Sequence, residues 1–208
     1  MTGATTALSE PALASGGDAA ALAAARRTMI DTQLRPSGVN DPRVLAVMAE
    51  VPRENFVPAD RRAVAYVDRA VPLGSGRFLA PPISHGLMLT EARPTPGDRA
   101  LLVGEDGYLA ALVRPLVGTL SVLAPEAALK KGNGDYTLIL IDGAFEVFPD
   151  ALGSRLADDG RVLGGFVEDE ITRLAVGRKA GDTVTFLTVI EADFRLLPGF
   201  AAPRKWSF

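Results

Sequence analysis

The sequence contains no cysteine, which excludes disulfides, thiolate nucleophiles and cysteine-ligated zinc or iron–sulfur centres. His85 is its single histidine, and we expect no metal site. No apolar stretch reaches the roughly 20 residues that a membrane-spanning helix needs. The first residues carry no basic segment of the kind that opens a secretory signal. We therefore expect a cytoplasmic protein that does not contact a membrane.

An excess of positive charge is absent as well. The 22 Lys and Arg residues against 25 Asp and Glu give a formal net charge of −3 at pH 7, and the basic residues are scattered along the chain. Surfaces that bind nucleic acid need a basic footprint, so we expect no nucleic-acid partner. What the chain does have is 208 residues, 48% of them hydrophobic, which is enough to bury the core of one domain.

Three regions follow one another along the chain. Residues 1–17 are small and polar and predict a flexible leader. Residues 18–94 predict an N-terminal helical subdomain on the substrate side. Residues 95–208 predict an α/β core of the Rossmann-like kind.

The helical subdomain carries recognisable helix signals. Asp18 predicts the start of a helix over residues 19–34, and Asp41 followed by Pro42 predicts the start of a second one. Residues 71–79 predict a kinked extended segment because they contain two glycines. A helix from about residue 83 to residue 89 follows.

A β-α-β unit over residues 99–126 organises the α/β core. It reads as a buried strand over 100–103, a turn that holds Gly104, Glu105, Asp106 and Gly107, a helix over 108–117 and a strand over 119–123. Such a turn brings its backbone close to a ligand and presents the free N–H groups of a helix. A dinucleotide fingerprint has three glycines in the order GxGxxG, and this turn has fewer.

The rest of the core predicts a parallel sheet with a C-terminal antiparallel strand pair. An apolar strand over residues 136–141 ends at Asp142 and Gly143, on the sheet edge where ligands of open α/β sheets bind. A helix over 149–156 and a strand over 161–166 come next. Residues 184–190 and 194–197 predict the closing antiparallel pair.

The tail over residues 198–208 carries Trp206 and Phe208, which we expect to cover an apolar edge. The interval between residues 124 and 136 is too short for a helix, a strand and their connections, since a crossover alone needs at least about 10–12 residues. We infer that one β-α unit is deleted from the sheet.

Several segments together resemble the protein-L-isoaspartate O-methyltransferase family. The first, MIDTQLRPSGVNDPRVLAVMAEVPRENFVP, is the most specific of them. The others are AYVDRAVPLGSGR, PGDRALLVGEDGYLAALV, ILIDGAFEVFPDALGSRLADDGRVLG and the terminal RLLPGF. The resemblance implies a methyltransferase sheet and transfer of a methyl group from S-adenosylmethionine to the isoaspartyl carboxylate of damaged proteins.

The resemblance also implies a set of site residues. The methyl donor, if any is bound, would contact Gly104, Glu105, Gly107, Asp142 and Gly143. Arg77 and His85 would face the peptide or protein substrate. Each has a simpler structural interpretation: the glycines allow tight packing, Glu105 complements a helix N-terminus, Asp142 forms a turn, Arg77 is a solvated surface charge and His85 is a core histidine.

The chain departs from the family pattern at both halves of the site. Leu102 occupies the acidic position before the glycine turn, and Ala124, or Leu123 if the alignment shifts by one, occupies the position of the acid that holds the donor ribose. Glu126 comes two positions late. Phe78 and Ala80 stand where the family has hydroxyl residues near the substrate carboxylate, so no catalytic residue can be assigned.

Three hypotheses follow from these patterns. The first is a peptide- or protein-binding pseudoenzyme that has lost catalysis or retains it only weakly. The second is an active S-adenosylmethionine-dependent carboxyl methyltransferase with a rearranged donor site. The third is a self-associating protein whose exposed sheet edge pairs in a homodimer.

Overall fold

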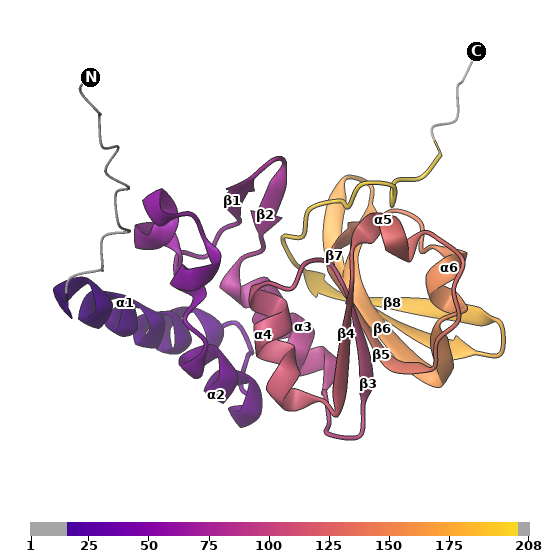
Figure 1. Ribbon diagram of the computed structural model, residues 1–208, viewed down its shortest axis with the longest axis horizontal. Helices are drawn as coiled ribbons and strands as arrows, with labels where there is room; N and C mark the ends of the chain where they lie inside the picture. The colour runs from indigo at the N-terminus through magenta and orange to yellow at the C-terminus, as the bar shows by residue number, and fades with distance from the viewer. Residues whose placement is uncertain (1–15, 204–208) are drawn as a thin grey trace, which may run out of the picture.

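The computed structural model describes residues 16–203 (Figure 1). Most of the leader predicted over residues 1–17 lies outside the described residues, as do Trp206 and Phe208. The fold combines a helical region with an α/β sheet, as the sequence predicts.

The helical region precedes the sheet in the chain. Its elements are α1 (Gly16–Met29), the π-helical turn η1 (Ile30–Leu34), α2 (Pro42–Glu50), the 3-10 turns η2 (Arg53–Phe56) and η3 (Ala59–Val64), and α3 (Pro82–Ala92). The predicted start of α2 is confirmed: the Arg43 N–H donates to Asp41 Oδ1 at 2.8 Å, and Pro42 is the first helical residue. The helix predicted over 19–34 widens into η1 in its last turn.

The segment predicted as one kinked extended stretch over residues 71–79 is a hairpin. Strands β1 (Val71–Gly74) and β2 (Arg77–Leu79) pair antiparallel. The turn between them places Ser75 and Gly76 at φ values of 52° and 75°, a left-handed conformation that tight hairpin turns require. The glycines that the sequence analysis took for a kink therefore reverse the chain.

A six-stranded sheet forms the rest of the protein. Its strands are β3 (Arg99–Val103), β4 (Thr119–Leu123), β5 (Tyr136–Phe145), β6 (Leu156–Glu168), β7 (Ile171–Ala180) and β8 (Thr183–Glu191), in the order β4-β3-β5-β6-β7-β8. The first four are parallel, and β7 is antiparallel to both β6 and β8. The short helices are α4 (Tyr108–Val113), η4 (Arg114–Leu116), α5 (Pro125–Ala128) and α6 (Asp150–Gly153).

The C-terminal antiparallel pair exists, but its members differ from the prediction. The pair is β7 with β8, whereas the segment predicted as a strand over residues 194–197 makes only an isolated bridge between Leu196 and Ala144. The sequence analysis missed β7 because Arg173, Arg178 and Lys179 interrupt its apolar pattern. The helices predicted over 108–117 and 149–156 are also shorter than expected.

The inferred deletion of a β-α unit agrees with the sheet. Between β4 and β5 the chain forms only the four-residue α5 and a loop. Among the described residues β4 pairs with β3 alone, so it lies at the edge of the sheet. The switch in strand order therefore falls between β3 and β5, where open α/β sheets bind ligands.

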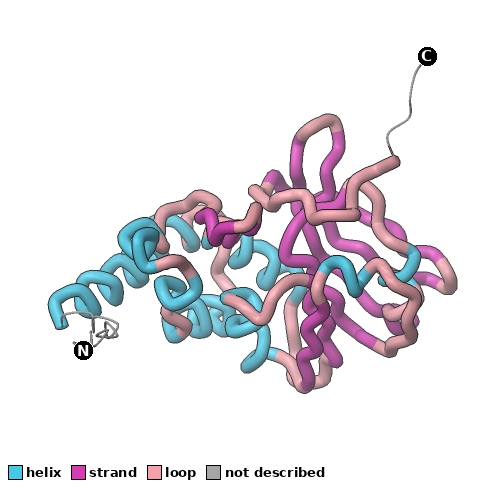
Figure 2. Tube along the Cα trace, turned by 45° about the horizontal axis from the view of Figure 1, so that its top comes forward, coloured by secondary structure: helices cyan, strands magenta, loops and turns pink. Residues whose placement is uncertain are grey.

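Alternation along β3 and β5 divides the core into two layers. Ala100, Leu102, Leu138 and Leu140 pack with α2, α3 and α4 on one face, whereas Leu101, Val103, Ile139 and Ile141 pack with α5 and α6 on the other. Side chains of a strand point alternately to the two faces, so a strand buried on both faces is apolar throughout. Figure 2 shows the helical region against one side of the sheet.

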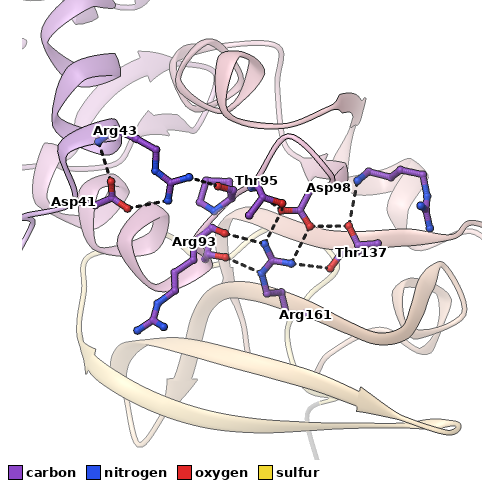
Figure 3. Close-up of polar contacts among 10 residues, drawn as sticks. Asp41, Arg43, Arg93, Thr95, Asp98, Thr137 and Arg161 are labelled. Atoms are coloured by element: carbon purple, nitrogen blue, oxygen red, sulfur yellow. Dashed lines mark hydrogen bonds and ion pairs between the residues drawn. The ribbon is translucent and has the colours of Figure 1, made fainter.

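A buried ion pair joins the helical region to the amino ends of the parallel strands (Figure 3). Asp98 accepts hydrogen bonds from Arg161 on β6 at 2.9 and 2.8 Å and from the Thr137 hydroxyl on β5 at 2.7 Å. Arg161 also donates to the carbonyls of Ala92 and Arg93 at the end of α3. Burial alone would raise the pKa of Asp98, but the hydrogen bonds from Arg161 and Thr137 outweigh it and hold that pKa far below its usual value.

Candidate functional site

A cavity of about 420 Å³ opens at the carboxyl ends of β3, β4 and β5; we call it the cleft. Its walls come from the β1–β2 hairpin, the turn over residues 104–107, the start of α5 and the segment over residues 193–198. The volume lies within the range of small-molecule sites. All five predicted donor residues line it, namely Gly104, Glu105, Gly107, Asp142 and Gly143.

The glycine turn packs tightly against the end of β5. A Cβ atom at Gly104 would lie 3.0 Å from Asp142 Cβ, and Gly104 has a φ of 156°. A Cβ atom at Gly107 would meet nothing within 4 Å. Of these two glycines, only Gly104 is therefore required for the close packing of the turn after β3 against β5. The helix after the turn has six residues, too few for a strong dipole at its N-terminus.

The structure brings His85 and Asp142 together. His85 lies on α3 with its side chain fully buried, and its Nε2 is 2.9 Å from Asp142 Oδ1. Its other ring nitrogen, Nδ1, is buried without a hydrogen-bond partner in the described part of the chain. Asp142 faces the cleft, while His85 lies behind it. The pair ties α3 to β5.

Arg77 contacts the glycine turn. Its Nη1 lies 2.6 and 2.7 Å from the two carboxylate oxygens of Glu105, and both side chains are half exposed. This ion pair joins the hairpin to the turn across the entrance of the cleft. The residue predicted to meet a substrate carboxylate therefore has a carboxylate partner within the chain.

The positions that carry hydroxyls in the family are apolar in this cleft. Phe78 is 41% exposed, and the Arg195 guanidinium lies 5.0 Å from the centre of its ring. Ala80 is buried, and its backbone carbonyl accepts a hydrogen bond from Arg53 at 2.6 Å. Neither side chain can donate a hydrogen bond to a ligand.

The ribose side of the cleft has a similar deficit. Leu102 is fully buried in the core, and Ala124, which precedes α5, offers no side-chain acceptor to the cleft that it lines. Glu126 also lines the cleft, two residues further along the chain. It is the single acidic side chain on that side of the wall.

The C-terminal segment covers the end of β5, which extends to Phe145 rather than ending at Ile141 as predicted. The Ala144 N–H donates to the Arg195 carbonyl at 2.7 Å, and the Leu197 N–H donates to the Ala144 carbonyl at 2.9 Å. A Cβ at Gly143 would lie 2.5 Å from the Leu197 side chain. The end of β5 is therefore held by these bonds on one side and by its pairing with Gly165 and Phe166 of β6 on the other.

Sequence reasoning assigned no role to Arg53. Its side chain is fully buried behind the cleft, where Nε donates to the Ala65 carbonyl at 2.7 Å and Nη2 donates to the Ala80 carbonyl. The guanidinium lies 4.9 Å from the centre of the Tyr108 ring, and Tyr108 lines the cleft. The sequence around it, VPRENFVP, places Arg53 next to Glu54 and Asn55 at the start of η2 and gives no signal that its side chain is buried.

Residues 16–203 contain no group of three or more His, Asp or Glu side chains placed to hold a metal ion. No helix in that range is long and apolar enough to cross a membrane. The cleft is therefore the candidate functional site.

Comparison with known proteins identifies the family. A family model described as protein-L-isoaspartate(D-aspartate) O-methyltransferase matches residues 25–127. A protein-L-isoaspartate O-methyltransferase of Koribacter versatilis is 35% identical over 194 residues, which span 80% of this chain and 87% of that protein. One from Roseiflexus castenholzii is 34% identical over 203 residues, spanning 83% and 90% of the two chains.

Solved structures agree with this fold. A crystal structure from Plasmodium falciparum, described as a protein-L-isoaspartate O-methyltransferase in complex with S-adenosyl-L-homocysteine, superposes with a TM-score of 0.68 at 18% identity and covers 83% of this chain and 97% of that one. A second protein-L-isoaspartate O-methyltransferase structure gives a TM-score of 0.69 at 16% identity, over 84% of this chain. These likenesses show the fold, and the relatives above show that the chain belongs to the protein-L-isoaspartate O-methyltransferase family.

Proposed function

We propose that this family member binds a peptide or protein through the cleft and has lost the methyl-transfer reaction or carries it out only weakly. The family reaction transfers the methyl group of S-adenosylmethionine to an isoaspartyl carboxylate oxygen and releases S-adenosylhomocysteine. A carboxylate is already ionised near neutral pH, so this transfer depends on orientation and proximity rather than on an acid or a base. The groups that orient donor and acceptor are the ones this cleft lacks.

The ribose side carries the main support for the proposal. Ala124 replaces the acid that would accept hydrogen bonds from the ribose hydroxyls, and Leu102 is buried in the core. The loss of two or three hydrogen bonds of about 0.5–1.5 kcal/mol each weakens binding by about one to three orders of magnitude. The side chains present therefore do not fit the methyl donor as those of the family pattern would.

The acceptor side supports the same proposal independently. Phe78 and Ala80 place no hydroxyl beside an incoming carboxylate. Arg77 is held by Glu105 instead of being free for a ligand. A cleft of about 420 Å³ nevertheless persists, so we propose that binding is retained without efficient chemistry.

One observation favours an active enzyme as the second candidate. Glu126 lines the cleft on the ribose side, and a carboxylate there is chemically able to accept hydrogen bonds from ribose hydroxyls. In that case the backbone of the glycine turn and Asp142 would complete a rearranged donor site.

A methyl-transfer assay on an isoaspartyl peptide tests the proposal. The protein is incubated with S-adenosylmethionine carrying a labelled methyl group, and an active family member is assayed in parallel. We expect the labelled methyl group to reach the peptide at a rate close to the rate measured without protein. Turnover comparable with the active relative, abolished by Glu126→Gln and kept by the matched exposed variant Glu50→Gln outside the cleft, would establish the second candidate instead.

A further inference from the structure

A buried cation without a direct counter-charge lies behind the inner end of the cleft. Arg53 is fully buried, and two of its nitrogens donate to backbone carbonyls. The third, Nη1, has no hydrogen-bond partner within residues 16–203. A buried charge is strongly disfavoured unless another charge or hydrogen bonds compensate it. The carbonyls of Ala65 and Ala80 supply only part of that compensation.

The hydroxyl beside this cation is also unpartnered. Tyr108 lines the cleft, yet its oxygen is buried and has no hydrogen-bond partner among the described residues. Burial raises the pKa of Tyr108 to about 12, so the hydroxyl is a neutral donor at physiological pH. The ring of Tyr108 lies under the Arg53 guanidinium. Attraction between that cation and the Tyr108 hydroxyl only partly offsets the effect of burial on the pKa of Tyr108. A neutral hydroxyl donor and a buried cation therefore lie side by side.

Neighbouring acids do not neutralise the pair. Asp142 faces the same cleft, but its carboxylate is hydrogen-bonded to His85, and Asp68 is hydrogen-bonded to the Ile83 N–H. Both attract Arg53 only from a distance. Glu54 is paired with Arg26 and with the Tyr66 hydroxyl on the far side of the turn η2. Positive charge thus remains at the inner end of the cleft.

We propose that Tyr108, backed by the charge of Arg53, forms a carboxylate subsite at the inner end of the cleft. The Tyr108 hydroxyl donates to a carboxylate oxygen of the ligand, and Arg53 supplies the opposite charge behind it. Hydrogen bonds to a charged acceptor are stronger than neutral ones. This inference rests on the proposed function, because it names the groups that receive the peptide carboxylate. The same chemistry is offered by the amino-acid end of the methyl donor.

Tyr108→Phe is the informative variant because it removes one oxygen atom only. That oxygen has no partner in the described residues, so we expect the variant to fold with an unchanged or slightly higher melting temperature. The matched control is Tyr136→Phe, which makes the same change at the start of β5, away from the residues that line the cleft.

Calorimetric titration without methyl donor tests the subsite. The ligands are a short peptide with an internal isoaspartyl residue and the same peptide with an amide in place of that carboxylate. We expect the wild type and Tyr136→Phe to bind the carboxylate peptide more tightly than the amide peptide. In Tyr108→Phe the ratio of the two affinities should be about tenfold smaller. Equal binding of the two peptides by the wild type, or a preference that survives in Tyr108→Phe, would overturn the inference.

Two further ligands distinguish the source of the carboxylate. S-adenosylhomocysteine has an amino-acid carboxylate, and 5′-methylthioadenosine lacks it. If Tyr108→Phe lowers the affinity for S-adenosylhomocysteine only, and not for the peptide or 5′-methylthioadenosine, the subsite belongs to the donor product. That result also contradicts the proposed weakness of donor binding. A lower melting temperature of Tyr108→Phe with unchanged peptide preference would instead show that a buried water satisfies the hydroxyl, and the inference fails.

Discussion

At the scale of single residues, Asp98 holds together parts of the chain that are far apart in sequence. It contacts Arg161 and Thr137 from neighbouring strands, and Arg161 in turn contacts the end of α3. The Asp98 and Arg161 side chains are only 6% and 16% exposed. The stability of the fold therefore depends on this carboxylate more than on any exposed ion pair.

Asp98→Asn tests this dependence. Breaking a buried ion pair leaves Arg161 without its counter-charge, and we expect the free energy of unfolding to fall by about 3–5 kcal/mol. The control is Asp135→Asn, which breaks the exposed pair with Arg99, whose side chains are 50% and 76% exposed; that change is expected to be at most about 1 kcal/mol. Denaturant titration measures both, and equal losses in the two variants would contradict the assignment.

The same carboxylate predicts how stability responds to acid. The pKa of Asp98 is lower in the folded protein than in the unfolded chain, where it is about 3.9. A lowered pKa contributes stability that is fully present above the unfolded value and is lost as the pH falls below it. We expect thermal stability to decline below about pH 4, with a clearly smaller decline in Asp98→Asn. An identical acid profile in that variant would contradict this role.

Residue-level chemistry was only partly visible in the sequence. The resemblance placed Asp142 and the two glycines at the cleft, where the structure has them. It gave no reason to connect His85 with Asp142 or Arg53 with Tyr108, because each pair joins the helical region to the sheet. Contacts between residues 57 or 55 positions apart depend on packing that no local pattern encodes.

At the scale of elements, the β1–β2 hairpin forms one wall of the cleft. Its turn side carries Arg77, which pairs with Glu105 on the glycine turn. Both side chains are half exposed, and exposed ion pairs contribute little to stability. Their role in this geometry is to position the hairpin.

Arg77→Gln should therefore loosen the hairpin without unfolding the protein. We expect a nearly unchanged melting temperature and faster hydrogen exchange of the backbone amides over residues 75–79. Added salt should speed this exchange more in the wild type than in the variant, because salt screens the ion pair. The exchanged pair Arg77→Glu with Glu105→Arg should restore slow exchange. Unchanged exchange in Arg77→Gln would show that the hairpin is held by its other contacts.

Elements with one clear signal were predictable, and those with mixed signals were not. The start of α2 and the bounds of β4 follow from a capping residue and from a short apolar run. Strand β7 was missed because basic residues interrupt its apolar pattern, and the extension of β5 depends on pairing with β6 and on hydrogen bonds with the C-terminal segment. Such tertiary contacts override local preference.

At the scale of the whole molecule, the chain keeps the family architecture, and the proposed loss of donor-binding side chains leaves that architecture intact. The sheet order and the helical region follow the family, and one β-α unit is absent beyond β4. Core packing needs apolar periodicity, which this sequence keeps on both faces of β3 and β5. Ligand binding needs a few polar groups at fixed points, which substitution removes without disturbing the core.

Restoring one of those groups should restore affinity. Ala124 precedes α5 and lines the cleft, so Ala124→Glu returns a carboxylate to the position that the ribose acid has in the family. We expect it to strengthen S-adenosylhomocysteine binding by about tenfold or more. Lys131→Glu, in the loop after α5 and outside the cleft lining, adds acidic charge without that placement and should have no such effect.

Calorimetric titration of the unmodified protein with S-adenosylmethionine and S-adenosylhomocysteine tests the central claim most directly. The account predicts no saturation below about 1 mM for either ligand. Saturable one-to-one binding at about 10–50 µM would contradict it, because the cleft would then hold the methyl donor without the side chains that the family uses.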